Sequence, residues 1–181
     1  PHVFAESEIE TVAAQTEAWE TQKAAERAAR AAERGQQPSV LDGVSLALPG
    51  LTRAVKLQKC AARVGFDWPE ASQILDKLQE ELDELKVELR GGDKARITDE
   101  MGDVLFSWAN LARAHDIDPE DGLRQTNAKF ERRFRRIEAL LAERGKAPKD
   151  SNLAEMESLW QQAKREERAV PPNVLAQKVP R

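Results

Sequence analysis

Apolar residues recur along most of this chain at the spacing of amphipathic helices. Five leucines separated by three, four, three and four positions predict one buried helical stripe after Pro69, namely Leu75, Leu78, Leu82, Leu85 and Leu89. A second apolar series predicts a helix from Asp93, a good N-cap, to about His115. This series comprises Ile97, Met101, Val104, Leu105, Trp108, Leu111 and Ala112. Because Gly91 and Gly92 separate the two series, the pattern predicts a helical hairpin.

Shorter signals predict the remaining helices. The apolar period of residues 48–65 indicates a helix that precedes the hairpin. The pair Asp118-Pro119 is an N-cap followed by a proline in the first turn, and it begins a long helix to about residue 145. A capping-box pattern that starts at Asn152 predicts a last helix to about residue 168.

The predicted segments differ in how much surface they can bury. We interpret residues 1–47 as a connector helix followed by a linker, because the helix expected over 6–33 has few apolar residues. Residues 48–168 form the predicted compact domain, and residues 169–181 are a predicted disordered tail. The expected fold class is all-α, a bundle of four to five core helices with an N-terminal helical arm. We also expect a dimer, since the stripes are long and several helices are too lightly covered for a monomer.

Composition narrows the classes of protein that fit. Of the 181 residues, 33% are charged and none is Tyr, which is typical of long helices. The net charge of −4 argues against a general nucleic-acid binder. The single cysteine, Cys60, excludes an internal disulfide framework and suits a reducing compartment, so a cytoplasmic location is expected. No apolar stretch approaches membrane-spanning length, and no membrane partner is expected.

Four carboxylates are arranged symmetrically about the two glycines. Glu84 lies eight residues before Gly92, and Glu100 lies eight residues after it. Glu81 lies eleven residues before Gly92, and Asp103 lies eleven residues after it. At a rise of about 1.5 Å per residue, an antiparallel hairpin brings each pair level, so the four acids converge. Such a cluster repels itself unless a hard cation such as Mg²⁺ or Mn²⁺ is bound.

The alternative is that the acidic run 80–84 is a solvated helix face, which is the usual place of charge runs. Two observations favour a site instead. Asp103 lies in an apolar sequence context, where an unpaired carboxylate is unfavourable. Gly102 lies inside the predicted helix at a cost of about 1 kcal/mol against Ala. This glycine suggests that something approaches the helix closely at that point.

Other catalytic groups are scarce, whereas basic residues are plentiful on the long helix after Pro119. Cys60 and the two histidines have no partner at triad or metal-ligand spacing, which makes nucleophilic catalysis improbable. Lys129, Arg133 and Arg136 project to one side of that helix. They are either a solvated basic face or a clamp for substrate phosphates opposite the acids. A stable nucleic-acid partner is not expected, because the acids would repel its backbone.

These motifs resemble those of a known family. Glu-Glu-x-x-Glu at 80–84 followed by Glu-x-x-Asp at 100–103 is the signature of the all-α nucleoside triphosphate pyrophosphohydrolases, and residues 48–167 look like the MazG catalytic domain. Further matches are Gln58-Lys59, the runs 61–68, 102–106, 110–113 and 127–134, and Trp160. The segment before residue 48 resembles the connection between two MazG repeats. The resemblance implies the C-terminal half of a two-domain protein.

The resemblance also implies an activity and assigns residues to it. Members form dimeric helical bundles that hydrolyse nucleoside triphosphates to a monophosphate and pyrophosphate. The implied metal ligands are Glu81, Glu84, Glu100 and Asp103, and Glu80 is a further catalytic acid near the metal. The implied substrate contacts are Lys77, Arg96, Asp99, Lys129, Arg132, Arg133 and Trp160. Two positions depart from the family pattern, since Cys60 replaces a basic residue and Asp99 replaces the usual Glu.

The expected function is therefore Mg²⁺-dependent pyrophosphohydrolysis of nucleoside triphosphates. We expect broad base specificity, because a tryptophan that stacks on the base tolerates any base. Trp160 is the first candidate for this stack, and Trp68 is the second, although a core role for Trp68 is slightly favoured. Two alternatives stay open: a non-catalytic helical dimerisation module, and the same chemistry on an alarmone or a modified nucleotide.

Overall fold

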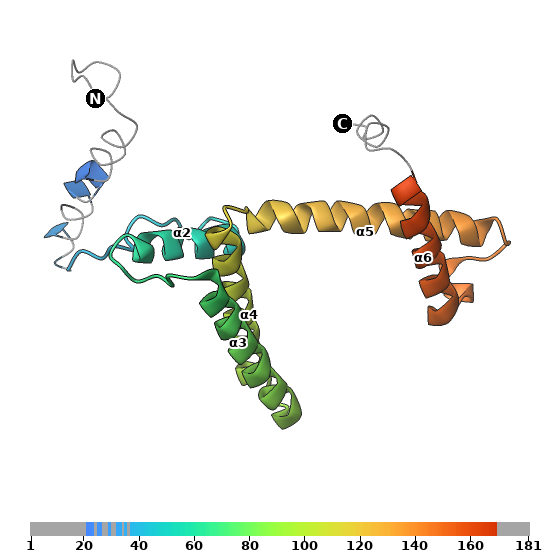
Figure 1. The fold of residues 1–181 in the computed structure, drawn as a ribbon, viewed down its shortest axis with the longest axis horizontal. Helices are drawn as coiled ribbons and strands as arrows, with labels where there is room; N and C mark the ends of the chain where they lie inside the picture. The colour runs from blue at the N-terminus through green and yellow to red at the C-terminus, as the bar shows by residue number, and fades with distance from the viewer. Residues whose placement is uncertain are drawn as a thin grey trace, which may run out of the picture. The chain divides into compact units, whose positions relative to one another are not determined.

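The computed structural model describes residues 37–169 without a gap, and 21–23, 25, 26, 29, 32, 33 and 35 before them. The described part of the chain is helical and contains no strand, which confirms the all-α prediction there (Figure 1). The described residues between 21 and 33 are helical, whereas most of the predicted arm lies outside the described residues. The tail predicted over 169–181 lies outside them too, except for Ala169.

Five α-helices and one short 3₁₀ turn follow the linker (Figure 1). Their bounds are α2, Gly50–Ala62; α3, Ala71–Gly91; α4, Lys94–Ala114; α5, Pro119–Ala142; η1, Pro148–Asp150; and α6, Leu153–Ala169. They fall into two compact units, of which unit 1 ends at Pro119 and unit 2 begins at Glu120.

The hairpin of unit 1 is set by local signals at the two glycines. Gly92 ends α3 in the left-handed conformation, with φ of 75°, which an L side chain rarely adopts. Asp93 then caps α4, because its carboxylate accepts hydrogen bonds from the amides of Ala95 at 2.9 Å and Arg96 at 3.4 Å. As a result, α3 and α4 lie side by side, and α2 packs on α4 (Figure 1).

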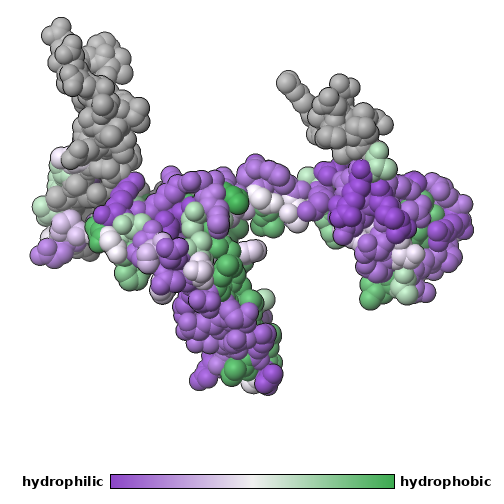
Figure 2. Space-filling view, in the orientation of Figure 1, coloured by the Kyte–Doolittle hydropathy of each residue, from purple (hydrophilic) through white to green (hydrophobic). Residues whose placement is uncertain are grey.

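The buried face of the hairpin differs from the predicted stripes. Ile74 and Glu81 are the buried residues of α3, at 1% and 5% exposure. Leu75 and Leu89 are exposed, so their prediction as core residues is wrong for this chain. The same correction applies to three residues of α4, namely Met101, Leu105 and Trp108. Helical spacing shows which residues share an apolar face, but it does not show what packs against that face. In this chain part of the face is exposed to solvent (Figure 2).

Unit 2 has a core of its own, formed where α5 meets α6. Its buried side chains are Ile137, Leu140, Leu141 and Leu159, and the partly buried Phe134, Met156 and Trp160 pack against them. Ion pairs between the two helices flank this core. None of the helices that the structure describes has the length and apolar character needed to span a bilayer.

Candidate functional site

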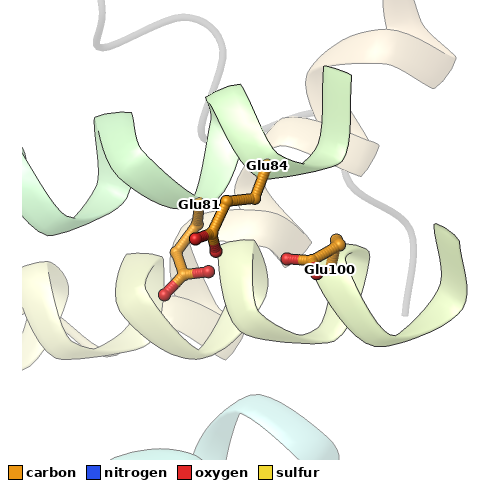
Figure 3. Close-up of side chains that lie close together, drawn as sticks. All are labelled: Glu81, Glu84 and Glu100. Carbon is orange, nitrogen blue, oxygen red and sulfur yellow. The ribbon is translucent and has the colours of Figure 1, made fainter. Parts of the chain in front are cut away.

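Three glutamates meet on the facing sides of α3 and α4. One carboxylate oxygen from each of Glu81, Glu84 and Glu100 lies within 4.8 Å of those of the other two. Figure 3 shows Glu81 and Glu84 on one helix and Glu100 opposite them on the next. The pairing across the hairpin that the sequence spacing predicts is therefore present for Glu84 and Glu100.

The positively charged side chain of Lys77 lies against this cluster. Its Nζ lies 2.8 Å from Glu81 and 3.0 Å from Glu80. Hydrogen bonds with Glu81, and then with Glu80, raise the pKa of Lys77 above its ordinary value. Glu80 is directed to Lys77 and lies outside the group of three, on the solvent side.

Glu100 has the least satisfied carboxylate of the three. Its Oε2 is buried and has no hydrogen-bond partner. Desolvation is the largest cause that raises the pKa of Glu100, followed by the neighbouring negative charges of Glu84, Asp103, Glu81 and Asp99. The site thus holds a buried carboxylate oxygen that no donor of the described residues satisfies.

Asp103 lies beside the group of three rather than in it. The pKa of Asp103 is raised first by desolvation and then by the charges of Glu81 and Asp99, so these acids are close enough to interact. A Cβ built on Gly102 would meet nothing of this chain within 4 Å, so the close approach inferred from this glycine is not made by the described chain and stays a prediction. The helix surface next to Asp103 is therefore open.

These residues fit a hard divalent cation. Carboxylate oxygens are the ligands that Mg²⁺ and Mn²⁺ prefer. Glu81, Glu84 and Glu100 supply three such groups from two helices, and the unpartnered oxygen of Glu100 is left for a further bond. A cation here would also offset the repulsion that raises the pKa of Glu100.

A cavity of about 590 Å³ opens beside the acids within unit 1. Lys77, Glu81 and Asp103 border it on one side. On another side lies the corner between α2 and α3, where Trp68 lines the cavity and is 47% exposed. The favoured prediction of Trp68 as a core residue is therefore wrong.

An ion pair fixes that corner to α4. The guanidinium of Arg113 donates to both carboxylate oxygens of Asp67, one of them at 3.0 Å, and Arg113 Nε donates to Asn110 Oδ1 at 2.9 Å. The hydrogen bond from Arg113 is the largest cause that lowers the pKa of Asp67. Sequence reasoning did not assign Gln58, Ser107, Asn110 or Arg113 to the site. For the three residues of α4, the available signal was their helical spacing from Asp103.

The predicted basic residues of α5 lie in unit 2, where Arg132 and Arg133 both pair with one glutamate. Glu167 accepts hydrogen bonds from Arg132 Nη2 at 2.8 Å and from Arg133 Nε at 2.7 Å. The guanidinium of Arg133 also lies 5.5 Å from the ring centroid of Trp160, so these two residues are brought together. Lys129 is exposed on α5. The prediction that these groups face the acids stays a prediction.

Two predicted substrate contacts, Arg96 and Asp99, lie near the N-terminal end of α4. The side chain of Arg96 is largely exposed and lies 3.7 Å from Glu88 and 3.9 Å from Asp93. Asp99 is exposed and contributes to the raised pKa values of Glu100 and Asp103.

Residues 70–137, which contain both acidic motifs, match the MazG nucleotide pyrophosphohydrolase domain. The chain carries a MazG domain. The nucleoside triphosphate pyrophosphohydrolase of Escherichia coli (strain K12) is 44% identical over 169 residues, which cover 92% of this chain and 62% of that protein. The nucleoside triphosphate pyrophosphohydrolase/pyrophosphatase MazG of Thermotoga maritima is 32% identical over 164 residues, 91% of this chain and 59% of that protein.

A third relative, the uncharacterized protein YabN of Bacillus subtilis (strain 168), is 40% identical over 169 residues, 93% of this chain and 33% of that protein. The chain thus spans about three-fifths of the length of the first two relatives. The MazG match includes α3, α4 and most of α5, so the three clustered glutamates all lie inside the matched segment.

Proposed function

We propose that this MazG domain hydrolyses nucleoside triphosphates, ATP among them, to a monophosphate and pyrophosphate in a Mg²⁺-dependent reaction. The observation that carries the proposal is the group of three glutamates with a buried, unpartnered oxygen, next to an open cavity. Two relatives that share most of this chain are named for the same activity, which supports the proposal.

The acids divide into two roles. Glu81, Glu84, Glu100 and Asp103 would hold the cation, with Mn²⁺ as a possible substitute for Mg²⁺. When bound, the cation polarises phosphate oxygens and offsets their charge. Glu80 lies at the edge of the group on the solvent side, where its carboxylate can accept a proton from the attacking water.

The cationic residues would bind the phosphates. Lys77 holds its Nζ between Glu80 and Glu81, so it is positioned to contact a phosphate that enters beside them. Lys129, Arg132 and Arg133 would offset the charge of the leaving pyrophosphate. Arg133 shares Glu167 with Arg132, and this keeps its guanidinium oriented without consuming all five of its donors. Arg96 and Asp99 complete the proposed set of substrate contacts at the start of α4.

We also propose that the enzyme accepts any nucleobase. An aromatic ring that stacks on the base does not distinguish one base from another. Trp160, beside Arg133, and Trp68, on the cavity wall, are the two residues proposed for such a contact. The single free cysteine supports a reducing, cytoplasmic setting for this function.

A second copy of the chain is the proposed occupant of the bare hairpin face. Met101, Leu105 and Trp108 follow one another at helical spacing on α4 and are all about half exposed. A contiguous apolar face of this kind marks an interface. Trp108→Glu is expected to convert a dimer to a monomer in sedimentation equilibrium, whereas Leu153→Glu, on α6, leaves the mass unchanged. A wild-type chain that sediments as a monomer would refute the dimer.

The decisive experiment is a panel of nucleoside triphosphates assayed separately for pyrophosphate and for phosphate, with and without Mg²⁺. We expect pyrophosphate from every triphosphate, and only with the cation. Glu100→Gln should lower the rate by about 10²–10³-fold, whereas Glu157→Gln, an exposed glutamate of α6, should leave it unchanged. Phosphate as the product, or a Glu100→Gln enzyme of wild-type rate, would contradict the proposed reaction.

A binding measurement separates the enzyme from a non-catalytic module. If the site binds substrate, Mg²⁺ with a non-hydrolysable triphosphate should raise the midpoint of thermal unfolding of the protein, because the ligand binds only the folded state. A dimerisation module predicts no rise in the midpoint and no turnover. An alarmone or a modified nucleotide as the preferred substrate would appear as a faster rate in the same panel.

A further inference from the structure

The cavity beside the acids contains a polar group that the proposed reaction does not use. Gln58 of α2 lines the cavity and is only 8% exposed. Its Nε2 donates to the backbone carbonyl of Phe106 at 2.8 Å. Its Oε1 is buried and has no hydrogen-bond partner. An acceptor left in this state is unfavourable unless a donor reaches it.

The orientation of this amide follows from its surroundings. If the Gln58 amide were reversed, Oε1 would face the carbonyl oxygen of Phe106 and the two acceptors would repel each other. The unpartnered atom is therefore the oxygen, and the missing ligand group is a donor. Nearby, Asn110 already uses its Oδ1 to accept from Arg113 Nε. Its amide therefore cannot rotate to supply that donor without breaking this hydrogen bond.

The stretch of α4 that borders the cavity is about as long as a nucleotide. Asp103 and Asn110, which both line the cavity, are seven residues apart, or about 10 Å along a helix. Gln58, on α2, contacts the backbone carbonyl of Phe106, which lies inside this interval, three residues beyond Asp103. A nucleotide spans a similar length from its α-phosphate to the far edge of its base. With the phosphates at the acids, the base therefore lies alongside Gln58 in the same cavity.

We propose that the base of the triphosphate occupies this cavity and that Gln58 Oε1 accepts a hydrogen bond from an N–H on the base edge. The inference rests on the proposed function and assigns a base-binding residue to it. Of the two candidate tryptophans, Trp68 then provides the stacking ring, since it lines the same cavity. Adenine, cytosine, guanine, uracil and thymine all carry an N–H on their pairing edge, so one acceptor suits every standard base. Gln58 thereby combines base recognition with broad specificity.

Purine riboside 5′-triphosphate tests this assignment, because its base has the shape of adenine but no N–H on the pairing edge. The wild-type enzyme should turn over ATP with a kcat/KM about tenfold above that of the purine riboside analogue. In Gln58→Met the ratio of the two kcat/KM values should fall to about one, since neither base finds an acceptor. A ratio within one variant is insensitive to the fraction of enzyme that is folded. Gln125→Met, at an exposed glutamine of α5, should keep the wild-type ratio.

Each result has a defined meaning. Equal turnover of the two substrates by the wild-type enzyme, or a preserved tenfold ratio in Gln58→Met, overturns the role of Gln58. A ratio that collapses in Trp160→Ala but not in Gln58→Met places the base at Trp160 and overturns the assignment too. In these cases pyrophosphate is still released from ATP, so the proposed function stands. If ATP yields no pyrophosphate in any arm, the proposed function fails and the inference fails with it.

Discussion

The α3–α4 hairpin and the α5–α6 pair use charge in opposite ways. In the hairpin, Glu81, Glu84 and Glu100 converge, and the nearby Lys77 pairs with only one of them. Between α5 and α6 every paired acid faces an arginine, as Glu166 faces Arg136 and Glu167 faces two arginines. The hairpin also leaves much of its apolar face bare, whereas α5 and α6 enclose four buried apolar side chains.

The pKa values record this difference. Like charges and desolvation raise the pKa of Glu100 and of Asp103. For Glu167 burial alone would raise the pKa, but the hydrogen bonds from Arg132 and Arg133 hold it below its usual range. The α5–α6 charges thus stabilise the fold, whereas the hairpin charges oppose it. Residues that oppose folding in this way are candidates for function, because a ligand can relieve what the protein leaves unsatisfied.

The largest expected effect tests whether unit 2 depends on its own core. Leu141 is 0% exposed, and Leu141→Ala should lower the free energy of unfolding by about 2–5 kcal/mol. Leu153→Ala, at a position that is 79% exposed, should change it by less than about 0.5 kcal/mol. Urea denaturation monitored by tryptophan fluorescence and circular dichroism measures both. Equal losses in the two variants would show that α5 and α6 do not pack as described.

The next effect tests the paired charges between the same helices. Glu167→Gln keeps the shape of the side chain but removes the charge that both Arg132 and Arg133 contact. The partly buried Arg133 would lose its counter-ion, and we expect a loss of about 1.5–3 kcal/mol. Glu157→Gln, at an exposed position on the same helix, is the matched control. A Glu167→Gln variant as stable as that control would mean that these ion pairs do not contribute to the stability of the fold.

Sequence alone predicted the parts of the fold that local signals determine. The spacing about Gly92, the Asp93 cap and the Asp118-Pro119 start each specify an element without reference to the rest of the chain, and each is found. The convergence of Glu84 with Glu100 follows from the same arithmetic. These signals are reliable because backbone geometry fixes the rise per residue and the conformation of a left-handed glycine.

Properties that depend on tertiary contacts were not predictable in the same way. The periodicity that placed Leu75 and Leu89 in a core could not show which neighbour covers them. The prediction for Trp68 was wrong because the sequence of an aromatic corner is the same whether its side chain packs in a core or lines a cavity. Gln58 was noted only as part of a family match and was given no role, since its importance lies in one unpartnered oxygen and in a hydrogen bond to a carbonyl 48 residues away.

A smaller effect tests how the hairpin is held. Gly92 has φ of 75°, and Gly92→Ala should cost about 1–2 kcal/mol because an L residue is strained there. Gly91 is helical, and a Cβ on it would meet only the Glu88 carboxylate at 3.9 Å. Gly91→Ala is therefore expected to be neutral or stabilising. Chemical denaturation of the two variants gives their free energies of unfolding and separates the effect of the left-handed conformation from the effect of losing a glycine. Equal changes in both variants would refute a hairpin determined by its turn.

The smallest effect compares the two regions by their response to pH in the presence of EDTA. The raised pKa of Glu100 means that its contribution to stability is complete below the unfolded carboxyl pKa and is lost as pH rises through the folded value. The lowered pKa of Glu167 has the opposite sign, so its contribution is present above the unfolded pKa and is lost as pH falls through the folded value. Thermal midpoints measured from about pH 4 to pH 7 should therefore rise in Glu100→Gln relative to wild type mainly at the upper end. In Glu167→Gln they should fall mainly at that same end. If Glu100→Gln lowered the midpoint near neutral pH without a cation, the acids of the hairpin would be stabilising one another, and the contrast between the two regions would be wrong.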